Sequence, residues 1–127
     1  MIPEYFQTRF RTDEEFRDWP RQFVIITAHA TTGQSWTDER NQSADEELLS
    51  YLRKKAKSVR RITGYSPDTG HAEPGWAVEL DLESAKELGR RFLQDAVYSV
   101  NEGRLFVLKC NGDDNPMFVD EFVKRLD

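Results

Sequence analysis

Phe23-Val24-Ile25-Ile26-Thr27-Ala28 is an almost wholly apolar run that is rich in β-branched side chains. A short run of this kind, bounded by polar residues, indicates a central strand that is buried on both faces of a sheet. The whole chain has 127 residues, close to the commonest size of one domain. Splitting it would leave pieces too small to bury adequate cores, so we expect a single domain over residues 1–127.

Helices and strands alternate on both sides of this run. Upstream, Thr12-Asp13-Glu14-Glu15 has the form of a capping box and predicts a short helix that ends near Trp19-Pro20. Downstream, Ser43-Ala44-Asp45-Glu46 is a second capping box. The elements predicted after it are a helix over 44–56, strands over 59–65 and 76–80, a helix over 82–92, strands over 96–100 and 104–110, and a helix from Pro116 to Leu126.

The order of these elements is α-β-α-β-β-α-β-β-α. Its centre, β-α-β-β-α-β, is the arrangement of ferredoxin-like folds. The predicted fold class is therefore α+β, with a central ferredoxin-like sheet, an added fifth strand and terminal helices. Another α+β sheet that pairs the same elements differently stays open as an alternative.

Charge and cysteine content limit the partners and the compartment. The net charge of −5 opposes broad binding to nucleic acid or to an anionic membrane. A basic run over 53–61 is interpreted as a solvated helix face and strand edge, with a phosphate contact as the alternative. Cys110 is the only cysteine, which suits a reducing compartment. No apolar run approaches the roughly 18 residues of a membrane span, and the first residues lack an apolar signal core, so we expect a soluble, cytoplasmic protein.

Long polar loops gather at one end of the predicted sheet. Under the predicted topology, the loops over 29–42 and 66–75 follow strands that end on the same side, and the residues just before the strand at 96–100 lie there too. Long polar loops often carry function. The candidate binding residues at this end are His29, Trp36, Asn41, Ser66, His71, Glu73 and Gln94.

An ordered set of short segments is similar to a known family. The segments are Ile26-Thr27-Ala28, residues 64–68 with 70–74, and residues 88–92 with 94–98. Together they resemble a bacterial family known as domain of unknown function 3293, over roughly residues 20–110. The resemblance implies a small bacterial cytosolic protein and no particular activity.

The chain departs from this family at two places. Ala30-Thr31 stands where members tend to have Asn-Pro, and Gly75 stands where they tend to have Ser. Any role of that asparagine or serine is therefore not transferred to this chain.

Known catalytic and metal-binding patterns match the chain poorly. His71-x-Glu73 before Pro74 lacks the C-x-x-C that completes a zinc deaminase site. A looser metal site from His29, His71, Glu73 and Cys110 has no supporting spacing, so neither a metal nor a cofactor is predicted. Cysteine at the end of a strand is more often a small buried hydrophobe than a nucleophile.

Two hypotheses about function follow. The first is a non-catalytic module that binds an unknown small ligand or protein through loops 29–42 and 66–75. The alternative is a small hydrolase or metal-assisted enzyme in which His71 and Glu73 transfer protons or ligate metal, with its remaining catalytic residues unknown. Neither nucleic acid nor a membrane is an expected partner, and a homodimer is left open.

Overall fold

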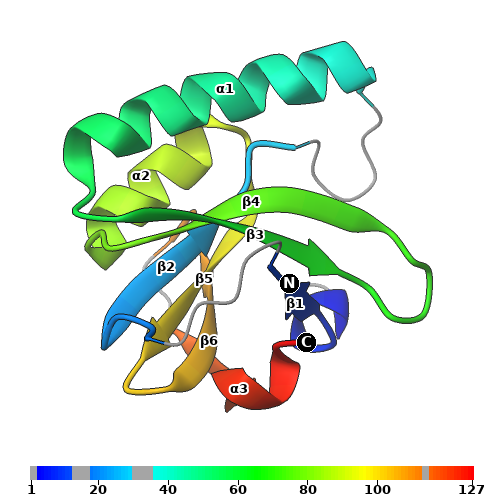
Figure 1. Cartoon of the computed structure of the whole chain (residues 1–127), viewed down its shortest axis with the longest axis vertical. Coiled ribbons are helices and arrows are strands. Elements are labelled where there is room, and N and C mark those ends of the chain that lie inside the picture. Colours follow the sequence, from blue (N-terminus) through cyan, green and yellow to red (C-terminus); the bar gives the residue numbers. More distant parts are fainter. Residues whose placement is uncertain (1–2, 13–17, 30–35, 113–114) are drawn as a thin grey trace.

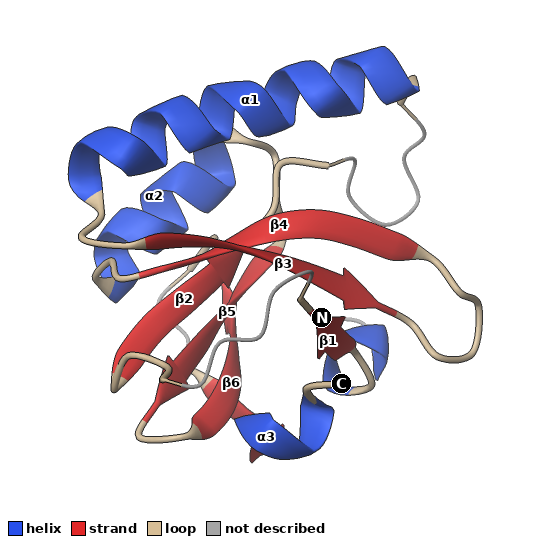
Figure 2. Ribbon diagram, viewed as in Figure 1, coloured by secondary structure: helices blue, strands red, loops and turns tan. Residues whose placement is uncertain are grey.

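The computed structural model describes residues 3–12, 18–29, 36–112 and 115–127, and one sheet runs through them (Figure 1). The sheet has seven strands in the order β1-β3-β4-β2-β5-β6-β7, and all neighbouring strands are antiparallel. It curls into a half-barrel (Figure 2). The strands are β1 (Arg9–Arg11), β2 (Gln22–Ile26), β3 (Val59–Tyr65), β4 (Ala72–Val78), β5 (Ala96–Asn101), β6 (Arg104–Lys109) and β7 (Met117–Glu121).

Three α-helices and a short 3-10 helix accompany the sheet in the described part of the chain. They are η1 (Pro3–Phe6), α1 (Asp38–Lys55), α2 (Leu82–Arg91) and α3 (Phe122–Arg125). Helices α1 and α2 lie on one side of the sheet, and α3 lies on the other (Figure 1).

The predicted ferredoxin-like fold with one added strand is wrong. The sheet has seven strands and curls into a half-barrel, and its two outermost strands, β1 and β7, were not predicted. Strand β1 has only three residues, and it exists because Phe10 lies opposite Gly64 of β3. Such a short segment has no alternation that could identify it, so long-range pairing decided its structure.

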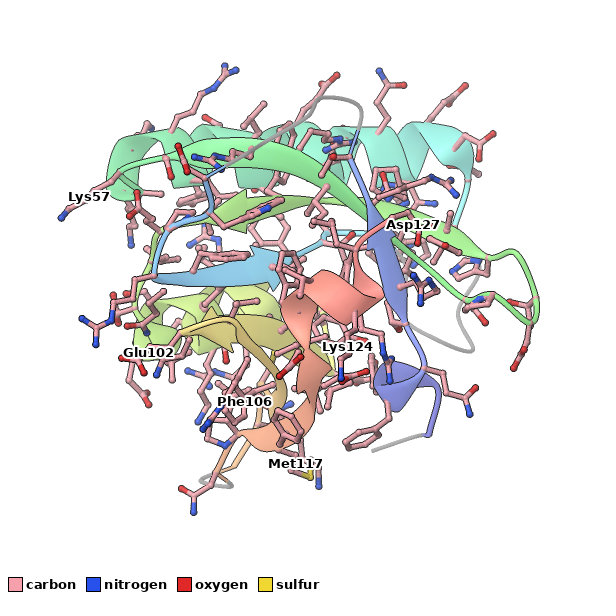
Figure 3. The ribbon with its side chains drawn as sticks, turned by 60° about the horizontal axis from the view of Figure 1, so that its bottom comes forward. Lys57, Glu102, Phe106, Met117, Lys124 and Asp127 are labelled. Atoms are coloured by element: carbon pink, nitrogen blue, oxygen red, sulfur yellow. The ribbon has the colours of Figure 1, made fainter. Side chains whose placement is uncertain are left out.

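The predicted C-terminal helix from Pro116 to Leu126 is also wrong. Residues 117–121 form strand β7, which pairs with β6, and only Phe122–Arg125 is helical. The Phe106 and Phe118 rings meet edge-on across these strands, with centroids 5.9 Å apart. Figure 3 shows Phe106 and Met117 close together at this edge of the sheet. Hydrogen-bonded pairing with β6 and the ring contact therefore stabilise a strand here, although the spacing of the apolar residues predicted a helix.

Two further boundaries differ from the predictions. Helix α1 begins at Asp38, because the side chain of Thr37 accepts a hydrogen bond from the backbone N–H of Arg40 at 3.1 Å. The predicted Ser43 cap therefore lies inside the helix. Strand β4 begins at Ala72, so the loop before it is short and Glu73 is a strand residue. The helix predicted before Trp19 falls largely on residues 13–17, outside the described residues.

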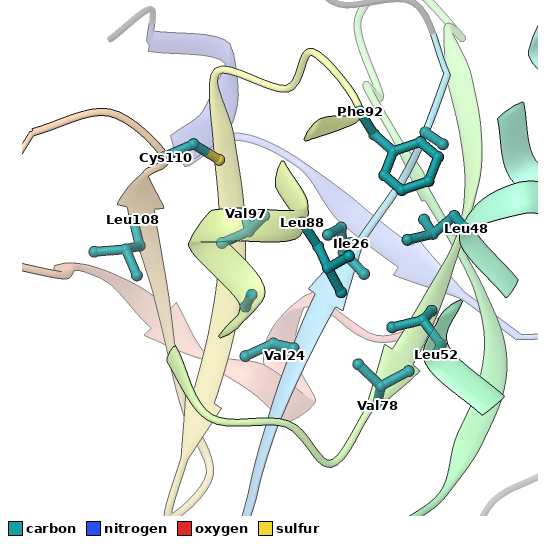
Figure 4. Packing of buried hydrophobic residues seen from close by; sticks show 12 residues of the cluster. Val24, Ile26, Leu48, Leu52, Val78, Leu88, Phe92, Val97, Leu108 and Cys110 are labelled. Carbon is teal, nitrogen blue, oxygen red and sulfur yellow. The ribbon is translucent and has the colours of Figure 1, made fainter. Parts of the chain in front are cut away.

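Strand β2 is buried on both faces, as its composition predicted. Val24 and Ile26 face α1 and α2, where they pack with Leu48 and Leu52 of α1 and with α2 (Figure 4). Phe23 contributes to the core on the opposite face. Alternate side chains of a strand point to opposite faces, so this one strand joins the two cores.

The second core lies between the sheet and the C-terminal segment. Its buried members are Phe10, Phe23, Ile25, Ile62, Ala77, Val100, Leu105 and Phe122. After α3 the chain returns to β1, where the backbone N–H of Asp127 donates to the carbonyl of Phe10 at 2.8 Å. The Arg9 guanidinium also contacts the Asp127 carboxylate, at 2.8 Å, and Figure 3 shows Asp127 beside β1. The C-terminal segment therefore links the two outer strands of the half-barrel.

Candidate functional site

The ends of several strands lie together at one end of the sheet. Strand β2 ends there at Ile26, the turn over residues 66–71 joins β3 to β4 there, and β5 begins there after Gln94. Antiparallel pairing of neighbouring strands places these ends together. These segments carry five of the seven candidate residues predicted from the sequence, and the other two lie at the start of α1. Among the seven, Gln94 is the buried one.

Gln94 holds the chain in place after β2. Its side-chain amide donates to the backbone carbonyls of His29 at 2.7 Å and Phe92 at 3.1 Å, and the residue is 7% exposed. The Thr27 hydroxyl donates to the carbonyl of Pro74 at 2.9 Å and accepts from the backbone N–H of His29 at 3.2 Å. Gln94 therefore fixes the backbone of His29.

His29 follows the end of β2, at this end of the sheet. It is half-buried, and its imidazole has no hydrogen-bond partner among the residues that the structure describes. Burial lowers its pKa below the ordinary value of 6.5, against opposing effects of Asp45 and Glu73. At pH 7 the ring is therefore neutral, with one nitrogen as donor and the other as acceptor.

An interacting trio beside His29 was missed by the sequence analysis. The Asp45 carboxylate of α1 accepts from the Trp76 indole N–H at 3.0 Å and from Nη1 of Arg61 at 2.9 Å. The Arg61 guanidinium also lies over the Trp76 ring, 4.2 Å from its centroid. Arg61 and Trp76 are opposite each other in the register of β3 and β4. One signal was available, because Asp45 interrupts the inward stripe that continues through Leu48 and Leu52.

We call His29, Asp45, Arg61, Glu73 and Trp76 the His29 cluster. The charges of Asp45, Glu73 and Arg61 all act on His29. The cluster combines a neutral imidazole, an ion pair and an indole at one partly exposed end of the sheet.

The predicted pair of His71 and Glu73 is in contact. Nε2 of His71, the last residue of the turn, lies 3.2 Å from Oε1 of Glu73 in β4. The His71 side chain is 71% exposed, whereas that of Glu73 is 27% exposed. Ser66 closes the adjacent turn through its backbone, donating to the carbonyl of His71 and accepting from the N–H of Gly70.

The remaining predicted residues lie at the start of α1. Trp36 is half-buried, with the Arg40 guanidinium 4.0 Å from its ring centroid. Asn41 is a helix residue rather than a loop residue, and its backbone N–H donates to the carbonyl of Thr37 at 3.0 Å. It lies one turn before Asp45 and therefore on the same side of α1.

Cys110 has the properties of a core residue. It is fully buried in the core beneath α2, and burial raises the pKa of its thiol to about 11. A thiol with that pKa is protonated at pH 7 and is a poor nucleophile and metal ligand. Among the described residues, no group of three or more His, Cys, Asp and Glu side chains could hold a metal ion.

The basic run does not form one surface. Arg60 and Arg61 point to opposite faces of β3, where Arg60 donates to the carbonyl of Asp18 at 2.6 Å and Arg61 pairs with Asp45. Arg53 and Lys54 lie in the exposed last turn of α1, where cations favour the helix dipole. These charges therefore have different structural roles. Separately, no helix in the described part of the chain is long and apolar enough to cross a membrane.

Comparison with known proteins assigns the chain to a family. The model of the family described as protein of unknown function, DUF3293, matches residues 26–97, which is more than half of the chain. The chain belongs to this family. The matched segment runs from the end of β2 into β5 and includes every residue of the His29 cluster. No curated protein matches the chain.

Proposed function

We propose that this domain is a non-catalytic module that binds a small ligand at the His29 cluster. The observation that carries the proposal is the half-buried imidazole of His29, which has no hydrogen-bond partner in the described part of the chain. Pockets for small ligands commonly place a few convergent polar groups among apolar and aromatic side chains. Gln94 and Thr27 hold the backbone of His29, so less backbone ordering is needed when a ligand binds.

The surroundings of two nucleophilic side chains, Cys110 and Ser66, favour binding over catalysis. Cys110 is buried, and this burial raises the pKa of its thiol. A nucleophile must lie within hydrogen-bond reach of a base, and neither residue has such a contact with His29 or His71 in the described residues.

The chain has two histidines, so the ring signals of each can be followed separately by NMR. We expect members of a small-molecule library to shift the His29 ring signals saturably, and His29→Gln to abolish their binding. His71→Gln is the matched control, because its ring is largely exposed and lies at the same end of the sheet. Asn41→Ala should weaken binding while leaving the fold intact.

A library that leaves the His29 signals unchanged would contradict the proposal. Equal binding by wild type and His29→Gln would place the ligand elsewhere. If only a protein partner shifts these signals, the module binds protein and not a small ligand.

The contact between His71 and Glu73 supports a second candidate, a small hydrolase. A carboxylate 3.2 Å from a histidine can orient the ring for proton transfer. Hydrolysis of p-nitrophenyl acetate and p-nitrophenyl phosphate tests this candidate directly. Turnover that is lost in both His71→Asn and Glu73→Gln would support it, and rates equal to those of buffer for both substrates would dismiss it.

We also propose that the domain works in the cytoplasm of a bacterium. Its single cysteine cannot form an internal disulfide, and that cysteine is buried. Such cysteine usage suits a reducing compartment. Fractionation of cells that express the chain at its natural level would test the location.

A further inference from the structure

The guanidinium of Arg61 is fixed by two of its neighbours. Its Nη1 donates to both carboxylate oxygens of Asp45, at 2.9 and 3.0 Å. Its plane lies over the Trp76 ring at 4.2 Å, and the Trp76 N–H donates to the same carboxylate at 3.0 Å. Three elements, α1, β3 and β4, therefore set the orientation of this side chain.

Both contacts leave one donor edge of the guanidinium open. A guanidinium presents its Nε–H and one Nη–H side by side, as a fork that matches two oxygens of a carboxylate or phosphate. Asp45 uses only Nη1, so Nε and Nη2 of Arg61 have no protein acceptor among the described residues. The Arg61 side chain is 32% exposed and is therefore not sealed inside the core.

We propose that Arg61 anchors an oxyanion of the ligand, a carboxylate or a phosphate, through this Nε/Nη2 fork. The proposal rests on the function proposed above and adds the chemical class of the ligand. Asp45 and Trp76 are positioning residues, because they hold the fork without occupying it. The charge of Arg61 acts on His29, so both side chains belong to the same part of the molecule.

The charges around Arg61 make the fork selective. Asp45 compensates the charge of Arg61, and Glu73 adds a second negative charge near His29. An anion that offers only a point charge is therefore weakly attracted. An anion that accepts two parallel hydrogen bonds is bound by directional hydrogen bonds as well as by charge attraction. Lysine keeps the charge but cannot form the fork.

The test is an NMR titration of the ¹⁵N-labelled full chain with sodium acetate, sodium phosphate and sodium chloride at equal ionic strength. We expect the Nε–H signal of Arg61 to shift saturably with acetate, with phosphate or with both, and not with chloride. A response to only one of the two oxyanions identifies its class as the ligand's. Arg61→Lys should bind the responding anion about tenfold more weakly or worse, because a charge-assisted hydrogen bond is lost.

Arg53→Lys is the matched control, because Arg53 is exposed in the last turn of α1 and makes no ion pair in the described part of the chain. The wild-type titration decides the outcome even if Arg61→Lys does not fold. An Arg61 Nε–H signal that responds to neither oxyanion would overturn the proposal, as would an equal response to chloride. Uncharged library members that shift His29 and bind Arg61→Lys unchanged would overturn the oxyanion anchor alone and leave the proposed binding function standing.

Discussion

The packing of α2 against β5 and against Cys110, just after β6, depends on a glycine, and this can be tested with a double-mutant cycle. A Cβ added at Gly89 would overlap Sγ of Cys110 and lie 3.3 Å from Cγ1 of Val97. Overpacking of this kind costs about 1–3 kcal/mol. Alanine is favoured over glycine inside a helix by about 1 kcal/mol. Gly89→Ala should therefore lower the free energy of unfolding by about 0–2 kcal/mol.

Removing the sulfur should reverse the sign of this effect. Cys110→Ala alone should cost about 1 kcal/mol, because a buried, methylene-sized group is lost. In that background the new Cβ at position 89 occupies the space that Sγ leaves, so Gly89→Ala should stabilise the protein by up to about 1 kcal/mol. The double variant should then be close to wild type, with a coupling energy of about 1–3 kcal/mol.

Urea denaturation followed by circular dichroism measures all four corners of the cycle. The four proteins must have comparable m-values, the slopes of unfolding free energy against urea concentration, before their midpoints are compared. Additivity within about 0.5 kcal/mol would refute the reasoning, because it would show that Gly89 and Cys110 do not compete for the same space. A single Gly89→Ala variant that is clearly more stable than wild type would refute it as well.

Three further predictions concern the core and the C-terminus. Gly75→Ala should lower the free energy of unfolding by about 1–3 kcal/mol, because its Cβ would lie 2.7 Å from a backbone oxygen of β2. The midpoint of thermal unfolding should fall, and an unchanged midpoint would refute the close approach. Hydrogen bonds from Tyr65 and Arg9 lower the pKa of Asp127, so their stabilisation is complete above the unfolded-state pKa of about 3.8 and is lost as pH falls through the folded-state value. Between pH 5 and 2, urea midpoints should therefore fall more steeply for wild type than for Asp127→Asn, and parallel curves would contradict this. The Cys110 thiol should react with Ellman's reagent at pH 8 only as fast as the chain opens; immediate reaction in the native state would show that the thiol is accessible.

Much of the secondary structure follows from the sequence alone. The run at 23–28 predicted a strand buried on both faces, and β2 has this character because Val24 and Phe23 enter different cores. The short polar segment at 101–103 ends in a glycine, which is typical of a tight turn between two strands, and Glu102 and Gly103 have φ values of 51° and 79°. The contact between His71 and Glu73 also joins residues that are two apart in the sequence. These features depend on neighbouring residues only.

Tertiary structure decided the remaining features. Strands β1 and β7 exist because they pair with β3 and β6, and the return of the chain to Phe10 links the outer edges of the half-barrel. The trio of Asp45, Arg61 and Trp76 joins one helix and two strands, so its members become neighbours only when the register of β3 and β4 is set. Local propensity and spacing determine α1, α2 and the central strands, whereas contacts between residues distant in sequence determine the outer strands and the candidate site. Their free energy comes from packing and pairing that appear only in the folded chain.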